Sequence, residues 1–293
     1  RQRQMCIRDR NTTERLEHHE EAPSLKECLH LLVTNRPLLM LFLGNIFFVI
    51  IKVSEQASFY FAYDALFNAK YNGFLDIAKA PGSFLAGIFV PIIIERLGRK
   101  ADSKKFYQVC CVMGIVLNGL FALCTYNGIM NKGAGQSVSL LTGLMVIVFS
   151  AVVTFPLEFK NLMQKEMEAE TVDYVEWKTG KRVEGTMLSI MSFTGKLEGT
   201  LSSFICLQVL ARTGYVEHTT DVSTLQNHST LLGLFLMTTV FPMVGYALML
   251  IPMHFYNITG DSHRRMIKDI MARRAQAGEA AAQEAVAAEA KEG

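Results

Sequence analysis

Charge is distributed very unevenly along this chain, and that pattern limits the folds open to it. No Asp, Glu, Lys or Arg occurs between Lys105 and Lys132, between Lys132 and Glu158, or between Asp221 and Asp261. A helix that spans a membrane needs about 20 consecutive apolar residues, and each of these runs is long enough. A soluble core does not require charges to be segregated in this way. The chain is therefore predicted to be an all-α membrane protein.

Three further apolar runs, each interrupted by charges, bring the predicted number of membrane helices to six. Only 19% of the residues are charged, against roughly 25% in soluble proteins. The formal net charge of +2 argues against a nucleic-acid-binding protein. One such run could be a buried helix of a soluble protein, but six in succession favour a membrane bundle. The predicted helices are residues 37–65, 73–95, 105–126, 138–160, 185–211 and 230–254.

The basic residues of the predicted loops orient this bundle. Of the 29 Lys and Arg, 23 lie in the two ends of the chain and in the loops 96–105 and 160–182, whereas the opposite loops hold three. Cytoplasmic loops carry such an excess, so both termini are predicted to be cytoplasmic and the protein to lie in the cell membrane. The predicted parts are a cytoplasmic segment (1–36), a six-helix membrane domain (37–254) and a cytoplasmic tail (255–293).

The two ends of the chain have unusual composition. Residues 1–10 are charged and lack the apolar stretch of a signal peptide. They resemble translated sequencing-adapter sequence, the alternative being an ordinary polar linker, and we interpret residues 11–36 as the remnant of a central loop. The tail from residue 275 is rich in Ala and Glu and has low complexity.

Charged residues within the predicted helices indicate where a polar interior is expected. A charge at mid-membrane costs about 2.5–3.5 kcal/mol, so it faces a cavity, a partner or water. The first, second and fifth helices carry such charges and are expected to line a cavity; the third and sixth carry none and are expected to face lipid. Lys52 and Glu55 are spaced to pair within their helix, as are Asp76 and Lys79. Tyr60 suits either sugar stacking or a position at the membrane interface.

The fifth helix carries a polar stripe around a central lysine. Steps of three and four residues place its members on one helical face; they are Ser189, Ser192, Lys196, Thr200 and Ser203. Hydroxyl groups alone could simply bond to the carbonyls of their own helix. The lysine favours a functional face, and because Glu198 points elsewhere on the helix, the partner of Lys196 is expected on another helix.

Enzymatic and metal-binding motifs are absent from the sequence. The six cysteines form no C-x-x-C pair, and there is no H-E-x-x-H pattern, P-loop or G-x-S-x-G elbow. We therefore expect no catalytic residues, no metal site and no bound cofactor.

The segment between the fourth and fifth helices resembles a family signature. It reads Asp173-Tyr174-x-Glu176-Trp177-x-Thr179-Gly180-Lys181-Arg182-x-Glu184-Gly185 and is followed by Lys196. This pattern resembles that of the glycoside–pentoside–hexuronide:cation symporters, melibiose-permease-like members of the major facilitator superfamily. Two further segments resemble the superfamily loop between helices eight and nine and the start of helix seven: Arg96-Leu97-Gly98-Arg99-Lys100 and Asn35-Arg36-Pro37-Leu38-Leu39.

The resemblance implies that the six helices are helices seven to twelve, the C-terminal half of a twelve-helix transporter. Such a transporter moves a sugar or sugar derivative together with Na⁺ or H⁺ by alternating access. The cation-binding carboxylates of the family lie mainly on helices two and four, in the N-terminal half that this sequence lacks. The implied partners are therefore a sugar-like solute, a monovalent cation, the bilayer and that other half, with no nucleic acid.

The resemblance also gives roles to particular residues. Lys196 is implied to be the helix-eleven lysine near the sugar and cation sites. The further candidates for substrate and cation coupling are Ser192, Thr200, Glu55, Lys52 and Tyr60. The candidates for a cytoplasmic gate are Glu170, Asp173, Glu176, Arg182, Arg96 and Arg99. Two alternatives stay open: a stand-alone six-helix membrane protein, either a structural partner or a membrane enzyme, and the same transporter fold carrying a non-sugar solute.

Overall fold

The computed structural model describes residues 25–66, 70–97, 102–131, 136–180, 183–217 and 226–292, without the side chains of residues 25, 90, 93–97 and 277–292. The described chain is helical and contains no strand, which confirms the predicted all-α class. Its elements are α2 (Leu25–Thr34), α3 (Arg36–Tyr60), the short π-helical segment η1 (Phe61–Ala65), α4 (Lys70–Leu97), α5 (Ser103–Met130), α6 (Leu140–Thr179), α7 (Glu184–Thr213), α8 (His228–Phe255) and α9 (Gly260–Glu292).

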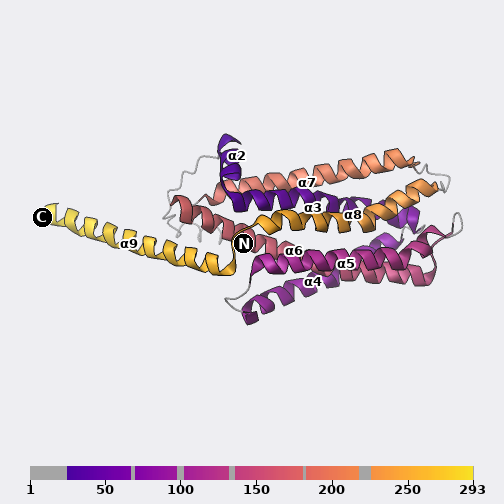
Figure 1. Cartoon of the computed structure of the whole chain (residues 1–293), viewed down its shortest axis with the longest axis horizontal. Helices are drawn as coiled ribbons and strands as arrows, with labels where there is room; N and C mark the ends of the chain where they lie inside the picture. Colours follow the sequence, from indigo (N-terminus) through magenta and orange to yellow (C-terminus); the bar gives the residue numbers. More distant parts are fainter. Residues whose placement is uncertain are drawn as a thin grey trace, which may run out of the picture.

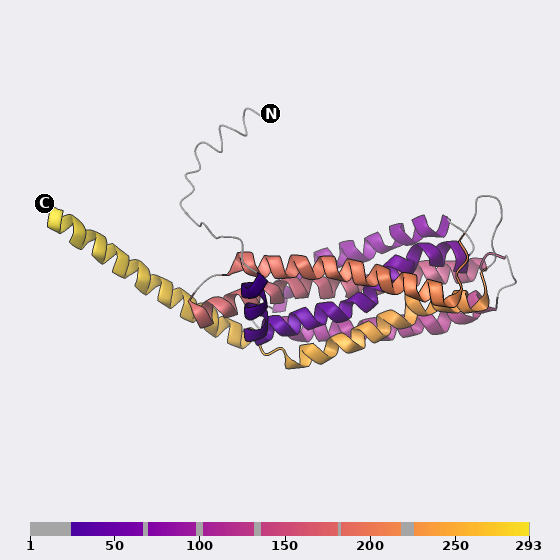
Figure 2. The ribbon, with the colours of Figure 1, turned by 90° about the horizontal axis from the view of Figure 1, so that it is seen from above.

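Six long helices run side by side in one bundle, while α9 projects from one end of it (Figures 1 and 2). Helix α8 packs against α3 and α5, α6 packs against α4 and α5, and α7 packs against α3. The end of α4, the end of α6 and the end of α8 all lie at the end of the bundle where α9 begins (Figure 1). We call this the α9 end; the charge distribution predicts it to be cytoplasmic.

Local sequence signals set where the bundle helices begin and end. Asn35 caps α3 by accepting a hydrogen bond from the Leu38 amide, and a proline follows in the first turn. Asn227 caps α8 through the Thr230 amide, at 2.7 Å. Helices α6 and α7 end at Gly180 and Gly214, whose positive φ angles of 71° and 77° favour glycine. The six bundle helices begin within three residues of their predicted starts.

Four helices of the described chain are long and apolar enough to cross a membrane: α3 with η1, α5, α6 and α8. Helices α4 and α7 lie in the same bundle and carry charges within their apolar sequence. Helix α6 has 40 residues, which is about 60 Å at 1.5 Å per residue, twice the thickness of a hydrocarbon core. It therefore runs well beyond residue 160, where the sequence predicted its end.

The expectation that the third and sixth helices face lipid fits only one face of each. On α5 (the third), Val109 and Val116 are exposed, whereas Cys111 is buried. On α8 (the sixth), Ile251 is exposed, whereas Met249 is buried, because this helix packs against α3 and α5. An apolar helix packs against protein as readily as against lipid, so the lack of charge does not by itself place a helix at the periphery.

Candidate functional site

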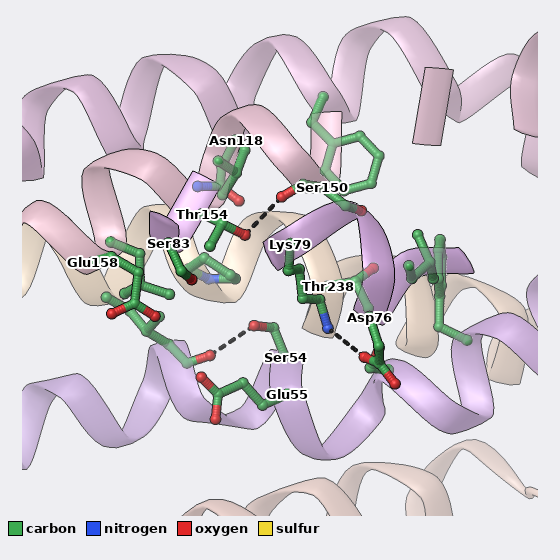
Figure 3. Close-up of a pocket in the computed structure, with 18 of the residues that line it drawn as sticks. Ser54, Glu55, Asp76, Lys79, Ser83, Asn118, Ser150, Thr154, Glu158 and Thr238 are labelled. Carbon is green, nitrogen blue, oxygen red and sulfur yellow. Dashed lines mark hydrogen bonds and ion pairs between the residues drawn. The ribbon is translucent and has the colours of Figure 1, made fainter. Parts of the chain in front are cut away.

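A polar cavity of about 600 Å³ opens between α3, α4, α5, α6 and α8. Four charged side chains line it and point into it from three helices: Glu55, Asp76, Lys79 and Glu158 (Figure 3). The apolar part of the lining includes Phe59 and Phe121. Charges that converge from several helices inside an apolar bundle are the feature by which binding sites of membrane proteins are recognised.

One of the two predicted ion pairs within a helix is present and the other is wrong. Lys79 Nζ lies 3.2 Å from Asp76 Oδ1, as the i,i+3 spacing predicted. Lys52 instead pairs with Glu198 of α7, at 3.4 Å. The Glu198 carboxylate is 9% exposed and needs a cation, whereas Glu55 is exposed in the polar cavity and does not pair with Lys52. Lys52 therefore pairs with Glu198, the more buried of the two carboxylates.

Lys160, which the sequence placed in a cytoplasmic loop, is fully buried in the bundle. Its ammonium lies 3.8 Å from the centre of the Phe48 ring, a favourable cation–π distance. It also donates to Gln164 Oε1 at 3.2 Å, and the amide of Gln164 donates to Asn45 at 2.7 Å. Two lysines and one glutamate, Lys52, Lys160 and Glu198, thus interact electrostatically across α3, α6 and α7.

The polar stripe of α7 lies on one face, as predicted, and this face points away from the bundle. Ser192, Lys196 and Thr200 are all exposed. The Thr200 hydroxyl donates to the Lys196 carbonyl at 3.0 Å, which is the local bonding that the sequence left open. Within the described residues the Lys196 ammonium has no ion pair or hydrogen bond. The structure therefore separates Lys196 from the polar cavity instead of placing it there.

Tyr60 lies at the opposite end of α3 from α2 and joins an aromatic group. Its ring packs edge-on against Tyr215, with centroids 5.4 Å apart. Phe59, Tyr63 and Glu217 line the same second cavity as Tyr60. The aromatic surface remains compatible with either sugar stacking or an interfacial position.

Two of the predicted cytoplasmic gate residues, Asp173 and Glu176, contact the chain's own C-terminal helix, and a third, Glu170, contacts α5. The contacts of these three carboxylates define the α6–α9 cluster. Asp173 lies 2.9 Å from Nε2 of His263, and Glu176 accepts from Nε of Arg274 at 3.1 Å. Glu170 accepts from the hydroxyl of Ser103 at 2.9 Å.

Trp177 completes the α6–α9 cluster. Its indole nitrogen donates to Asp269 at 3.0 Å, and its carbonyl accepts from Arg273 at 2.8 Å. Of the basic residues predicted for the gate, Arg99 and Arg182 lie outside the described residues, and Arg96 lies in the last turn of α4 with its side chain not described. Among the described residues, the basic partners are His263 and Arg274.

Sequence reasoning passed over several of the residues that the structure gathers. Glu158 and Lys160 are the only charges within the fourth predicted helix, 138–160, and they lie at its predicted end, where the loop 160–182 was expected to begin. Four residues of α9 are spaced by three, four and four positions, a pattern that predicts a common helical face. They are His263, Met266, Ile270 and Arg274. Tyr246 of α8 gave no signal, because a tyrosine in an apolar helix is common.

A bundle of long apolar helices with charges directed into an internal cavity defines a multi-pass membrane protein. Residues 4–260 match the family described as MFS/sugar transport protein, so the chain belongs to this family. This agrees with the family resemblance of the loop between α6 and α7.

Named relatives include transport proteins from several bacteria. The uncharacterized symporter YjmB of Bacillus subtilis is 26% identical over 89% of this chain and 53% of its own length. The glucuronide carrier protein homolog of Escherichia coli is 24% identical over 85% and 50%, and the isoprimeverose transporter of Lactiplantibacillus pentosus 24% over 91% and 51%. The chain thus spans about half the length of the curated relatives it matches. None of their names describes an enzyme, which agrees with the lack of catalytic motifs.

Proposed function

We propose that this chain is one six-helix repeat of a secondary active transporter that co-transports a sugar or sugar derivative with a monovalent cation. The observation that carries the proposal is the polar cavity, in which charged side chains from three helices face one another inside an apolar bundle. The family membership and the names of the relatives support the same reading. In such transporters the solute site lies near the middle of the membrane, between two repeats.

The exposed stripe of α7 fits this arrangement. In a complete transporter Ser192, Lys196 and Thr200 would face the second repeat, the helices that the family resemblance expects before this part of the sequence. The resemblance makes Lys196 the coupling lysine, and its lack of a partner among the described residues leaves its charge free for a carboxylate of that repeat, for water or for the solute. Lys52, Glu55 and Tyr60 complete the proposed coupling residues.

The α6–α9 cluster is the proposed inner gate. Charge-assisted contacts that differ between two conformations shift the population between them. We infer that Glu170, Asp173 and Glu176 exchange partners during the transport cycle, with Arg96, Arg99 and Arg182 as the other set. The proposed orientation places this cluster and both termini in the cytoplasm.

Uptake by the full-length gene product in membrane vesicles tests the function. Isoprimeverose and a glucuronide, taken from the names of the relatives, are the first solutes to test, with Na⁺ and H⁺ gradients imposed separately. We expect accumulation against a concentration gradient that collapses when an ionophore removes the driving ion. Equal uptake with and without any ion gradient would contradict co-transport, and uptake of neither sugar but of another solute would favour the non-sugar alternative.

A further inference from the structure

The polar cavity carries more negative than positive charge. Its lining holds three carboxylates, on Glu55, Asp76 and Glu158, and one ammonium, on Lys79. Lys79 is paired with Asp76 at 3.2 Å. Neither Glu55 nor Glu158 has an ion-pair partner among the described residues; Glu158 accepts only an amide hydrogen bond, from Asn161 at 3.3 Å. Glu55 is exposed to the cavity and Glu158 is half-buried, so a positive charge bound between them would be attracted by both carboxylates.

The neutral groups of the cavity wall present acceptors. Four hydroxyl groups donate their single proton to carbonyls of their own helices, and so direct only lone pairs to an occupant; they are Ser54, Ser150, Thr154 and Thr238. The side-chain amide of Asn118 donates to the Gly114 carbonyl at 2.8 Å, which leaves its oxygen as an acceptor. Asn72, Ser58 and Ser83 also line the cavity and can donate as well as accept. The oxygens that can only accept, together with the carboxylates, suit a cation.

A buried tyrosine hydroxyl points to the same occupant. Tyr246 also lines the polar cavity, is 1% exposed, and its hydroxyl has no hydrogen-bond partner among the described residues. It interacts electrostatically first with Cys111 and Cys110, and then with Glu158 and Glu55. A Cβ at Gly114 would meet the Tyr246 ring, so glycine at this position lets the ring lie where it does. A ligand bound beside this hydroxyl would supply the partner that it lacks.

We propose that the polar cavity is a Na⁺ site, with Glu55 and Glu158 as its charged ligands and Tyr246 among the neutral oxygens around it. The described residues contain no group of three or more His, Cys, Asp or Glu side chains suited to a metal ion, so two carboxylates and neutral oxygens favour a monovalent ion over a divalent one. A proton would need only one acceptor and would leave the remaining oxygens unused. This site is separate from the cation carboxylates that the family resemblance assigns to the other half.

Binding of radioactive ²²Na⁺ to the purified chain in lipid nanodiscs tests the proposal, with choline chloride holding the ionic strength constant. The variants are Glu55→Gln, Glu158→Gln and Tyr246→Phe. The matched control is Asp261→Asn, which removes an exposed carboxylate on α9, outside the cavity. We expect each glutamate change to weaken Na⁺ binding by about tenfold or more, because charged ligands dominate cation affinity. Tyr246→Phe should weaken it less, and the control should bind as the parent does.

The glutamate variants are expected to insert and fold, because removing a charge from a membrane helix lowers its insertion cost. A Na⁺-dependent rise in the thermal midpoint, present in the parent and absent from the variants, gives a second readout. Unchanged Na⁺ binding after both glutamate changes would overturn the site, as would no Na⁺ binding by the parent. Stabilisation by low pH with no effect of Na⁺ would overturn it in favour of a proton. Failure of sugar uptake would leave the Na⁺ result intact, so the two proposals can fail separately.

Discussion

At the scale of single residues, burial decides which charges pair. Lys52 and Glu198 lie on different helices, and Glu198 is the more buried of the two. Removing one partner of a buried pair leaves the other charge uncompensated, while replacing both can be nearly neutral. We expect Glu198→Met to lower the free energy of unfolding by about 1–3 kcal/mol, a range reduced for the partial exposure of Lys52.

A double-mutant cycle measures this pair directly. Lys52→Met with Glu198→Met should regain most of the stability lost in either single change, measured by denaturant unfolding in detergent micelles. If the stability lost in the double variant equals the sum of the losses in the two single variants, the two side chains do not interact.

Lys196 should behave differently, because its ammonium is exposed and without a partner among the described residues. Lys196→Ala is expected to change the stability of the chain by about 0.5 kcal/mol or less, as for other exposed substitutions. In the full-length transporter it should abolish accumulation of solute against a gradient. Lys196→Arg should restore this only in part, since the planar guanidinium donates in fixed directions. Normal accumulation by Lys196→Ala, at equal membrane levels, would make this lysine dispensable for coupling.

At the scale of elements, the docking of α9 on α6 should depend on pH. The hydrogen bond with Asp173 raises the pKa of His263 above its ordinary value of 6.5; the charges of Glu170 and Glu166 act in the same direction, and burial opposes them. The docked state therefore favours the protonated imidazole. The stability that His263 gives to the docked state is fully present below the pKa of the undocked histidine. It is lost as pH rises through the raised pKa of the docked histidine.

Trp177 provides a probe of this docking, because it is the only tryptophan in the sequence and donates to Asp269 of α9. We expect its fluorescence to report release of α9 as pH rises from below 6.5. In His263→Gln this transition should be absent. A transition of the same midpoint in His263→Gln would assign it to another group, such as Glu166 or Glu170.

The sequence predicted elements better than contacts between them. Apolar runs are local features of the sequence, so the six bundle helices could be predicted from them; the end of α6 at Gly180, 20 residues beyond its apolar run, could not. Ion pairs depend on which helices pack together, and this is why Lys52 was assigned to Glu55, its neighbour on α3, instead of Glu198. Likewise residues 255–293 were predicted only as a cytoplasmic tail, although His263 and Arg274 share a face with two apolar residues.

The same contrast between local features and contacts between helices applies to the two sites. The carboxylates of the α6–α9 cluster could be predicted from the sequence, and the polar cavity could not. The charged segment around the family signature gave Glu170, Asp173 and Glu176 as candidates because they are close together in the sequence. The cavity takes Glu55 from α3, Glu158 from α6 and Tyr246 from α8, and no spacing in the sequence connects these helices. Only the packed bundle brings them together.

At the scale of the whole molecule, the orientation in the membrane is the most direct prediction. The end of α6 and the start of α9 lie at one end of the bundle, and the start of α8 lies at the other (Figure 1). Since 23 of the 29 Lys and Arg belong to the first end by sequence, this end should be cytoplasmic.

In a cysteine-free background, Lys178→Cys should react with a membrane-impermeant maleimide only in inside-out vesicles. Ser229→Cys, an exposed position in the first turn of α8, should react only in right-side-out vesicles. Because the two positions lie at opposite ends of one bundle, a single orientation requires opposite labelling. Labelling of Lys178→Cys from the outside alone would invert the topology and with it the proposed gate, whereas labelling of both positions from one side would contradict the bundle as a membrane-spanning unit.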